Sequence, residues 1–242
     1  MMANNFKKEV CIVIPTHKGT FDTVEKISLQ QLFYVIGDKY DTYFVCPDNI
    51  DMSEGLELLP YAKKETFDKR HFNNGPVGYN NFCLRSEFYE RFKDYKYMFI
   101  YQTDCLILYD AVDKYIRMDY DYYGAPLKHF EEEALCGGFS IRKIDKCLKL
   151  CKFFEQPEFD ITFYKRTGFK NEDVFFSMCL PKLLPYHLSS AFSWSCFVGY
   201  KEKLMATNGK IPMGLHGIKK MEEVKLVTNL LKKEVIQKYG IK

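Results

Sequence analysis

The chain has 242 residues, of which 47% are hydrophobic, and its formal net charge is +3. This length and apolar content suffice for one sizeable globular domain, which we expect to span residues 1–242. The net charge is too small to indicate nucleic-acid binding, and no long basic stripe is present, so we expect no nucleic-acid partner.

The chain carries no signal for a membrane span or for export. No apolar run approaches the roughly 18–20 residues of a spanning helix, and the polar N-terminus lacks the apolar segment of a signal peptide. The nine cysteines are odd in number and form no Cys-x-x-Cys pair, which indicates free buried thiols. We therefore expect a soluble cytoplasmic protein with at most a peripheral contact at the inner face of a membrane.

The first 50 residues read as the opening of a parallel sheet. The apolar run Glu9–Pro15 predicts a strand, and residues 16–19 form a polar loop. A helix with Leu29, Leu32, Phe33 and Ile36 on one face follows, and Thr42–Cys46 predicts a second strand. The loop after such a first strand often contacts a nucleotide. It contains neither known glycine-rich phosphate motif, which argues against a dinucleotide dehydrogenase or a nucleoside triphosphatase.

A helix is expected over Val77–Lys93, with an apolar stripe formed by Val77, Leu84, Phe88 and Phe92. It opens at Gly78, Tyr79 and Asn80. Free backbone amides at such a helix start suit an anion, although these residues are equally consistent with an ordinary first turn.

The most informative stretch is Tyr97–Tyr101, followed at once by Gln102, Thr103 and Asp104. Five apolar or aromatic residues in a row are typical of a strand buried on both faces. The polar triplet would then lie at the carboxyl end of the strand, where open α/β sheets bind ligands. An Asp at that position is suited to holding a divalent cation against a phosphate.

Three later features could complete a site. Gly137 and Gly138 form a turn before a strand, which allows either close approach to a ligand or simply a tight turn. Asn171 is expected to cap a helix whose first turn contains Glu172 and Asp173, acids that are usually structural at this position. His216 is expected in a loop between Gly214 and Gly217, where the flanking residues contribute little to packing.

The remaining segments are less informative. His129–Glu133 is expected as a charged surface loop and Gln156–Lys170 as irregular chain. Residues Glu222–Tyr239 carry an apolar stripe and predict a closing amphipathic helix.

Asp104, the acids Glu172 and Asp173, and His216 could meet at one edge of the sheet. Together they could then hold a metal ion and supply a general base. Carboxylate and imidazole ligands together suit Mn²⁺ better than Mg²⁺. An ionised carboxylate opposite the ion could take a proton from an attacking hydroxyl. Transfer of a sugar from a nucleoside diphosphate to an acceptor hydroxyl is one of several reactions that such a group could serve.

The order of short motifs resembles a family of bacterial glycosyltransferase-like proteins of the DUF5672 type, related to the GT-A glycosyltransferases. The matching segments span nearly the whole chain and comprise Ile12-Val-Ile-Pro-Thr16, Gly78-Tyr-Asn80, Gln102-Thr-Asp104, Tyr122-Tyr-Gly-Ala-Pro126, Gly137-Gly-Phe-Ser140, Asn171-Glu-Asp-Val-Phe175 and Pro212-Met-Gly-Leu-His-Gly217.

This resemblance implies a single GT-A-like α/β domain, in which a mostly parallel twisted sheet is flanked by helices. It implies Asp104 and His216 as metal ligands, with Asp173 as the first and Glu172 as the second choice for the catalytic base. The implied nucleotide-sugar site comprises Pro15, Thr16, His17, Tyr79, Asn80, Gln102, Thr103, Asp104, Gly137 and Gly138. Gln102 replaces the first Asp of the usual Asp-x-Asp motif, which predicts weaker metal binding or metal-independent transfer.

The resemblance favours an inverting glycosyltransferase of surface-polysaccharide or glycan synthesis. Its donor would be a nucleotide sugar, expected to be a UDP-sugar, and its acceptor a carbohydrate or lipid-linked glycan. One alternative is a sugar nucleotidyltransferase, which would need a glycine-rich loop with a basic residue after the first strand. The loop here supplies Lys18 but only one glycine, which argues against this alternative. A non-catalytic sugar-binding protein of the same fold is the other alternative.

Overall fold

The computed structural model describes residues 9–73, 75–127, 134–156, 171–195 and 210–242. A six-stranded sheet crosses its centre in the order β3-β2-β1-β4-β9-β6. The strands are β1 (Val10–Pro15), β2 (Asp41–Pro47), β3 (Lys63–Phe67), β4 (Tyr97–Tyr101), β6 (Tyr122–Tyr123) and β9 (Phe139–Lys143). The β1–β2, β1–β4 and β2–β3 pairs are parallel, whereas β9 is antiparallel to both β4 and β6. The predicted α/β fold with a mostly parallel sheet is confirmed.

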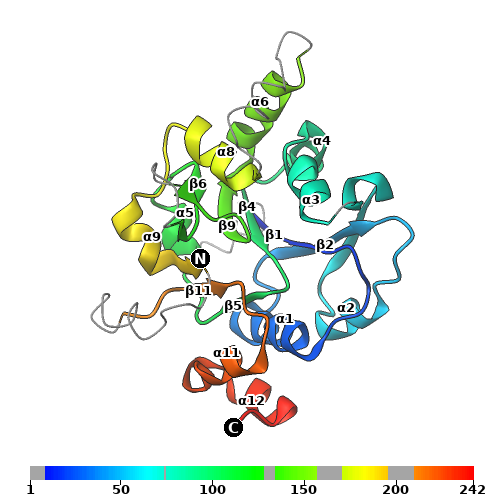
Figure 1. Cartoon of the computed structure of the whole chain (residues 1–242), viewed down its shortest axis with the longest axis vertical. Coiled ribbons are helices and arrows are strands. Elements are labelled where there is room, and N and C mark those ends of the chain that lie inside the picture. Colours follow the sequence, from blue (N-terminus) through cyan, green and yellow to red (C-terminus); the bar gives the residue numbers. More distant parts are fainter. Residues whose placement is uncertain (1–8, 74, 128–133, 157–170, 196–209) are drawn as a thin grey trace, which may run out of the picture.

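Helices cover both faces of this sheet, with α1 and α2 on one side and α3, α4 and α6 on the other (Figure 1). The helices of the described chain are α1 (Thr23–Ile36), α2 (Ser53–Leu58), α3 (Pro76–Cys83), α4 (Ser86–Glu90), α5 (Val112–Ile116), α6 (Ile144–Phe154), α8 (Glu172–Cys179), α9 (Tyr186–Phe192), α11 (Met221–Lys225) and α12 (Lys233–Tyr239), with short 3-10 helices η2 (Lys69–Phe72) and η3 (Thr228–Leu230).

Two smaller sheets accompany the central one. The first contains β10 (Ser193–Ser195), β11 (Gly214–His216) and β5 (Cys105–Ile107), and the second contains β7 (Pro126–Leu127) and β8 (Ala134–Leu135). The loop expected at His129–Glu133 and nearly all of the irregular segment expected at Gln156–Lys170 lie outside the described residues.

The central strands form where the apolar runs predicted them. All five residues of β4 are buried, and β1 is buried from Val10 to Ile14. Phe99 of β4 has no exposed surface, and its ring packs edge-on against Phe139 of β9, with the ring centroids 4.9 Å apart. The aromatic runs therefore fill the space between sheet and helices, as their burial of large area with few rotamers favours.

Helix α1 begins and ends at residues that suit those positions. The Asp22 carboxylate accepts from the Glu25 amide at 3.0 Å, and the Glu25 carboxylate accepts from the Asp22 amide at 2.9 Å, forming a capping box. Gly37 ends the helix with φ of 61°, a conformation that glycine adopts without steric cost. The Lys18 side chain donates to Glu25 at 2.6 Å, and this contact holds the start of α1 beside the loop that follows β1.

The single helix predicted over Val77–Lys93 is wrong. The chain forms α3 and α4, separated by Arg85 in an extended conformation. The side chain of Glu155, from the end of α6, accepts from the Ser86 amide at 3.1 Å and thereby satisfies the start of α4. Val77, placed on the apolar stripe, is 61% exposed, while Phe82 is buried instead.

The continuous closing helix predicted over Glu222–Tyr239 is also wrong, because the segment divides into α11, η3 and α12. Lys232 is extended, and its amide donates to the Gln31 side chain of α1 at 3.0 Å. The predicted apolar stripe is nevertheless buried throughout, at Val224, Val227, Leu231 and Val235. A side chain from a distant helix again caps a new helix within a continuous apolar pattern.

The eight cysteines of the described chain are free, and all except Cys179 are buried. Within the described residues, no helix combines the length and the apolar character needed to cross a lipid bilayer.

Replacing Phe99 by Ala is expected to lower the free energy of unfolding by about 3–5 kcal/mol, because it empties a filled site at the centre of the sheet. Urea denaturation followed by fluorescence measures the loss. Phe153→Ala is the control, because that ring is 59% exposed and its removal should change stability by about 0.5 kcal/mol or less. Equal losses in both variants would contradict the assignment of β4 as the core strand.

Candidate active site

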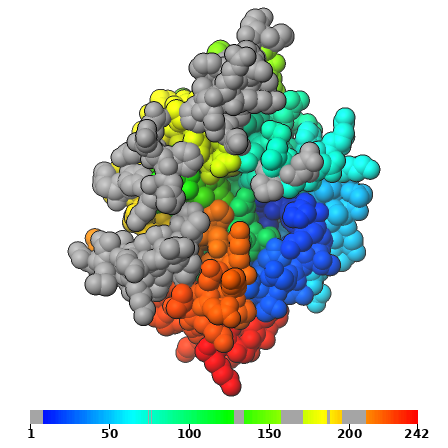
Figure 2. Space-filling model, in the orientation of Figure 1, coloured from blue at the N-terminus to red at the C-terminus, as the bar shows by residue number. Residues whose placement is uncertain are grey.

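A cavity of about 600 Å³ opens at the carboxyl ends of β1 and β4. Its walls come from the loop after β1, the start of α1, the chain between η2 and α3, the β4–β5 link and the residues after β11. The lining residues are Pro15, Thr16, His17, Asp22, Val24, Glu25, Phe72, Gly75, Tyr79, Gln102, Thr103, Asp104, Ile218 and Lys219. On the molecular surface, the N-terminal segment, coloured blue, and the orange segment after β11 meet beside green residues of the centre (Figure 2).

Seven of the predicted nucleotide-site residues line this cavity, namely Pro15, Thr16, His17, Tyr79, Gln102, Thr103 and Asp104. The other three do not belong to its lining. Asn80 donates to the side chain of Asn171 at 3.3 Å. Gly137 lies against Glu172 and Asp173, and Gly138 lies against Gln102 and His216. Asn171 stands at the N-cap position of α8, as predicted, but its side chain makes no capping hydrogen bond.

The Gln102–Asp104 segment is a tight turn between two sheets. The Cys105 amide donates to the Gln102 carbonyl at 2.9 Å, after which the chain leaves β4 and enters β5. Strand β5 pairs antiparallel with β11, in a register that places Cys105 opposite His216. The Gly217 and Ile218 amides then donate to the Asp104 carbonyl at 3.1 and 2.9 Å. This pairing brings residues 104 and 216 together across more than 100 positions of sequence.

The side chains of Asp104, His216 and Gln102 converge. His216 Nε2 lies 3.4 Å from Asp104 Oδ1 and 3.0 Å from Gln102 Oε1. The other ring nitrogen of His216, Nδ1, lies 3.0 Å from the sulfur of Cys136. Asp104 Oδ1 is buried and makes no well-formed hydrogen bond within the described residues, with His216 Nε2 3.4 Å away. A buried carboxylate oxygen held only by such a long contact is a suitable ligand for a cation.

Charge and burial shift the pKa values of Asp104 and His216 in opposite directions. Burial alone would raise the pKa of Asp104, but His216 and Lys219 outweigh it, and the net pKa is lowered. Burial alone would lower the pKa of His216, but Cys136 and Asp104 outweigh it, and the net pKa is raised. In the absence of another cation, the two side chains therefore favour an ion pair.

The donor set fits a divalent cation. Oxygen, nitrogen and sulfur atoms of Asp104, His216 and Cys105 lie within 4.8 Å of one another, and Gln102 adds an amide oxygen. Burial raises the pKa of the Cys105 thiol well above its usual range, so its sulfur is a poor ligand. The carboxylate, the amide and the imidazole, once it has lost its proton, are a mixed oxygen and nitrogen set, which suits Mn²⁺.

The two acids at the start of α8 have different environments. Asp173 is half-buried and accepts from the Gly137 amide at 3.0 Å and from the Val174 amide at 2.8 Å. Glu172 is only 2% exposed and forms an ion pair with Arg142, with 2.8 Å between Oε1 and Nη2. Burial and the adjacent Asp173 raise the pKa of Glu172 to about 6, against the effect of Arg142.

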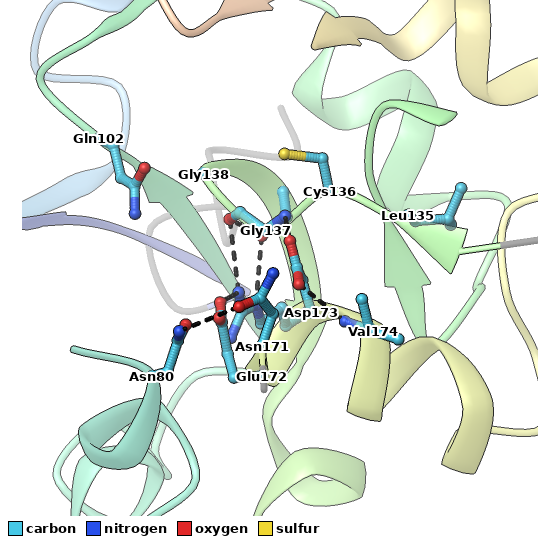
Figure 3. Close-up of polar contacts among 12 residues, drawn as sticks. Asn80, Gln102, Leu135, Cys136, Gly137, Gly138, Asn171, Glu172, Asp173 and Val174 are labelled. Carbon is cyan, nitrogen blue, oxygen red and sulfur yellow. Dashed lines mark hydrogen bonds and ion pairs between the residues drawn. The ribbon is translucent and has the colours of Figure 1, made fainter. Parts of the chain in front are cut away.

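Figure 3 shows the Gly137–Gly138 turn between Gln102 and the acids at the start of α8. A Cβ atom on Gly137 would lie 2.5 Å from Glu172 Oε1. One on Gly138 would overlap His216 Nε2 and lie 2.5 Å from Gln102 Oε1. The two glycines therefore form a thin wall with the acids of α8 on one side and the Asp104–His216 pair on the other.

Sequence reasoning missed several residues of the cavity wall. The Asp22-x-x-Glu25 spacing is a capping-box signal that would have identified Asp22 as the N-cap of α1, shortly after the loop that follows β1. Glu25 also accepts from Thr103 Oγ1 at 2.8 Å and from Lys18 Nζ at 2.6 Å, which ties the first loop to the β4–β5 turn. Lys219, three residues after His216, adds a positive charge that no pattern in the sequence indicated.

The folded chain was compared with solved structures. A galactosyltransferase, LgtC, in complex with donor and acceptor sugar analogues, superposes with a TM-score of 0.63 at 11% identity, covering 95% of this chain and 99% of that one. Core-mannan synthase A (CmsA/Ktr4) from Aspergillus fumigatus, in a form with Mn and GDP, gives a TM-score of 0.51 at 12% identity over 75% of this chain and 72% of that one. A glycosyltransferase involved in glycosylation of the major capsid of PBCV-1 gives 0.51 at 11% identity, with 91% and 99% covered.

These identities establish the fold alone, which is the GT-A fold of the glycosyltransferases. No curated protein matches the chain significantly in sequence. A family model described as "Protein of unknown function (DUF5672)" matches residues 62–216, which is more than half of the chain. The chain therefore belongs to the DUF5672 family.

Proposed function

We propose that this protein is a metal-assisted, inverting glycosyltransferase that moves a sugar from a nucleotide-sugar donor to an acceptor hydroxyl. The observation that carries the proposal is the convergence of Asp104, His216 and Gln102 beside a cavity of about 600 Å³ at the carboxyl ends of β1 and β4. A cavity of this size at this edge suits a small polar ligand. The GT-A fold and the donor and acceptor analogues bound by LgtC support the same reaction class.

The cavity offers a distinct environment to each part of a nucleotide sugar. Pro15, Thr16 and His17 would contact the nucleoside, and the Tyr79 ring would pack against a flat or apolar face. Lys219 supplies a positive charge for the diphosphate. The sequence resemblance predicts a UDP-sugar, and the GDP bound by the Aspergillus Ktr4 makes a GDP-sugar the second donor to test.

Asp104, His216 and Gln102 would hold a divalent cation, Mn²⁺ or Mg²⁺, on the cavity side of the glycine turn. When bound, such a cation would offset the negative charge that develops on a diphosphate leaving group. Gln102 contributes a neutral oxygen where a carboxylate is usual in this fold. The resulting site carries one negative charge fewer, and its affinity for the ion should be correspondingly modest.

Asp173 is our candidate for the general base. Its carboxylate is held by two backbone amides, which keep its orientation, and it lies across the glycine turn from His216. In the transfer, Asp173 takes the proton of the acceptor hydroxyl while the hydroxyl oxygen bonds to the anomeric carbon. The bond from that carbon to the phosphate oxygen breaks, and the nucleoside diphosphate leaves with the electron pair. A single displacement of this kind inverts the anomeric configuration.

We extend the proposal to the setting of the reaction. A carbohydrate or lipid-linked glycan would serve as acceptor, in surface-polysaccharide or glycan synthesis. The enzyme would act as a single cytoplasmic domain with at most a peripheral membrane contact. Release of a nucleoside diphosphate, rather than pyrophosphate, would distinguish this reaction from sugar nucleotidyl transfer.

Asp173→Asn is expected to lower kcat for sugar transfer by about 10²–10⁴-fold, because the amide cannot accept the proton. The Kd of the nucleotide sugar should stay within about threefold of wild type, since residue 173 does not line the cavity. Transfer is followed by nucleoside diphosphate release, and binding by calorimetry. Asp145→Asn, which changes an exposed acid in the first turn of α6, is the control. Full turnover in Asp173→Asn would remove Asp173 as the base.

Asp104→Ala and His216→Ala are each expected to weaken Mn²⁺ binding by about 10–100-fold, since each removes a donor atom. Gln102→Asp should strengthen Mn²⁺ binding, because it adds a negative charge beside the other ligands. Electron paramagnetic resonance of free Mn²⁺ gives the affinities without an activity assay. Asp94→Ala, an exposed loop residue, is the control. Wild-type affinity in both Asp104→Ala and His216→Ala would refute the metal site.

Gly138→Ala is expected to displace His216 and Gln102, because its Cβ would overlap the imidazole. Mn²⁺ affinity should fall at least about tenfold, and overpacking should cost about 1–3 kcal/mol of stability. Thermal unfolding and Mn²⁺ resonance measure the two effects. Gly240→Ala is the control for Mn²⁺ affinity: nothing lies within 4 Å of the added Cβ, but the φ of 57° strains any side chain, so this variant should lose stability without losing Mn²⁺ affinity. Unchanged Mn²⁺ affinity in Gly138→Ala would show that the glycine wall does not support the ligands.

A further inference from the structure

Arg142 is the fourth residue of β9 and has no exposed surface. Its guanidinium is nevertheless surrounded by polar partners. Nη1 donates to the Tyr89 hydroxyl at 3.0 Å and Nε to Ser140 Oγ at 3.1 Å. The rings of Tyr122 and Phe176 lie 5.3 and 5.4 Å from its central carbon. The side chain is therefore fixed from several directions.

The third arm of the guanidinium reaches the candidate active site. Nη2 donates to Glu172 Oε1 at 2.8 Å and to the Gly137 carbonyl at 3.4 Å. Ser140, which Arg142 also contacts, donates to the same carbonyl at 2.6 Å. Arg142 thus holds one end of the Gly137 peptide unit directly and through Ser140.

The other side of Gly137 is held through the partner of Arg142. Glu172 is the first residue of α8, so its ion pair with Arg142 fixes the start of that helix. The next residue, Asp173, accepts from the Gly137 amide. Arg142, Glu172, Asp173 and Gly137 therefore form a closed ring of contacts around one glycine.

This ring borders the Asp104–His216 group directly. The Gly138 carbonyl accepts from the Gln102 amide at 3.0 Å and from the Cys105 thiol at 3.1 Å. Any shift of Gly137 would move Gly138, which has no room beside His216. Arg142 thus fixes the position of the Gly137–Gly138 turn from one side. The group around Asp104 contacts the same turn on the other side.

We infer that Arg142 is a positioning residue, which acts through Glu172 to hold Asp173 and the Gly137–Gly138 turn in register with the Asp104–His216 group. The inference rests on the proposed function only for its effect on turnover. It assigns Glu172 to support of the site and leaves Asp173 as the carboxylate available to a substrate. A buried arginine is a costly way to fill the centre of a sheet, because apolar residues of similar volume often stabilise a core equally well.

The decisive variant is the double substitution Arg142→Met with Glu172→Gln, which removes both buried charges and leaves neither unpaired. Hydrogen exchange of the Gly137 amide, followed by nuclear magnetic resonance, reports the contact with Asp173 without an activity assay. We expect protection of this amide to fall at least about tenfold, while amides in β1 remain protected. Arg117→Met, which changes an exposed arginine, is the matched control and should leave Gly137 protected.

Arg142→Lys separates charge from geometry, because it keeps a buried cation but not the planar fork that reaches several partners. It also covers the case in which the double variant does not fold. In both variants we expect kcat for transfer to fall at least about tenfold, with KM for the donor within about threefold. Glu172→Gln alone retains an acceptor oxygen for Nη2 and should keep more than about a tenth of wild-type kcat.

Wild-type Gly137 protection and kcat in the folded double variant, or in Arg142→Lys if the double variant does not fold, would overturn the inference. A loss of kcat in Glu172→Gln as large as in Asp173→Asn would also overturn it, because Glu172 would then act on the substrate. If the wild-type protein transfers no sugar from UDP- or GDP-sugars, the proposed function fails. The exchange measurement on Gly137 then still decides whether Arg142 positions the turn.

Discussion

The antiparallel pairing of β5 with β11 is the interaction on which the site depends. The chain leaves the buried strand β4 through the Gln102–Asp104 turn and immediately pairs with a strand from near the end of the described chain. That register sets His216 opposite Cys105 and therefore beside Asp104. Without it, the Asp104 carboxylate would lie at the end of a sheet with no nitrogen ligand near it. A carboxylate at the carboxyl end of a strand is common in α/β folds. The β5–β11 pairing adds an imidazole beside it.

A second constraint is the thinness of the wall between the two halves of the site. Gly137 and Gly138 allow the start of α8 and the imidazole of His216 to approach opposite sides of one backbone turn. Any side chain at either position would separate them. The same turn is held by buried polar contacts from β9, whose cost is offset because each partner is satisfied. The same few residues therefore determine both the packing of the turn and the positions of the polar groups around it.

The structural relatives retain the arrangement of elements at only 11–12% identity. A fold of this kind hosts different chemistries, so the reaction must be argued from the residues at the sheet edge. Here those residues combine one carboxylate, one imidazole and one amide. Gln102 places a neutral amide oxygen 3.0 Å from His216 Nε2, so Asp104 is the one carboxylate among these three residues.

Local chemistry in the sequence was sufficient for the central strands and for α1 with its glycine end. The family resemblance pointed to seven of the residues that line the cavity. Continuous apolar runs and capping residues act over a few positions, and sequence displays them directly. The breaks at Arg85 and Lys232 were not visible, because the groups that cap the new helices, Glu155 and Gln31, come from distant segments. The different environments of Glu172 and Asp173 could not be predicted from the sequence either. Adjacent acids look alike in sequence, and only the folded chain brings Arg142 to one and the Gly137 amide to the other, since strand pairing and burial act across the whole molecule.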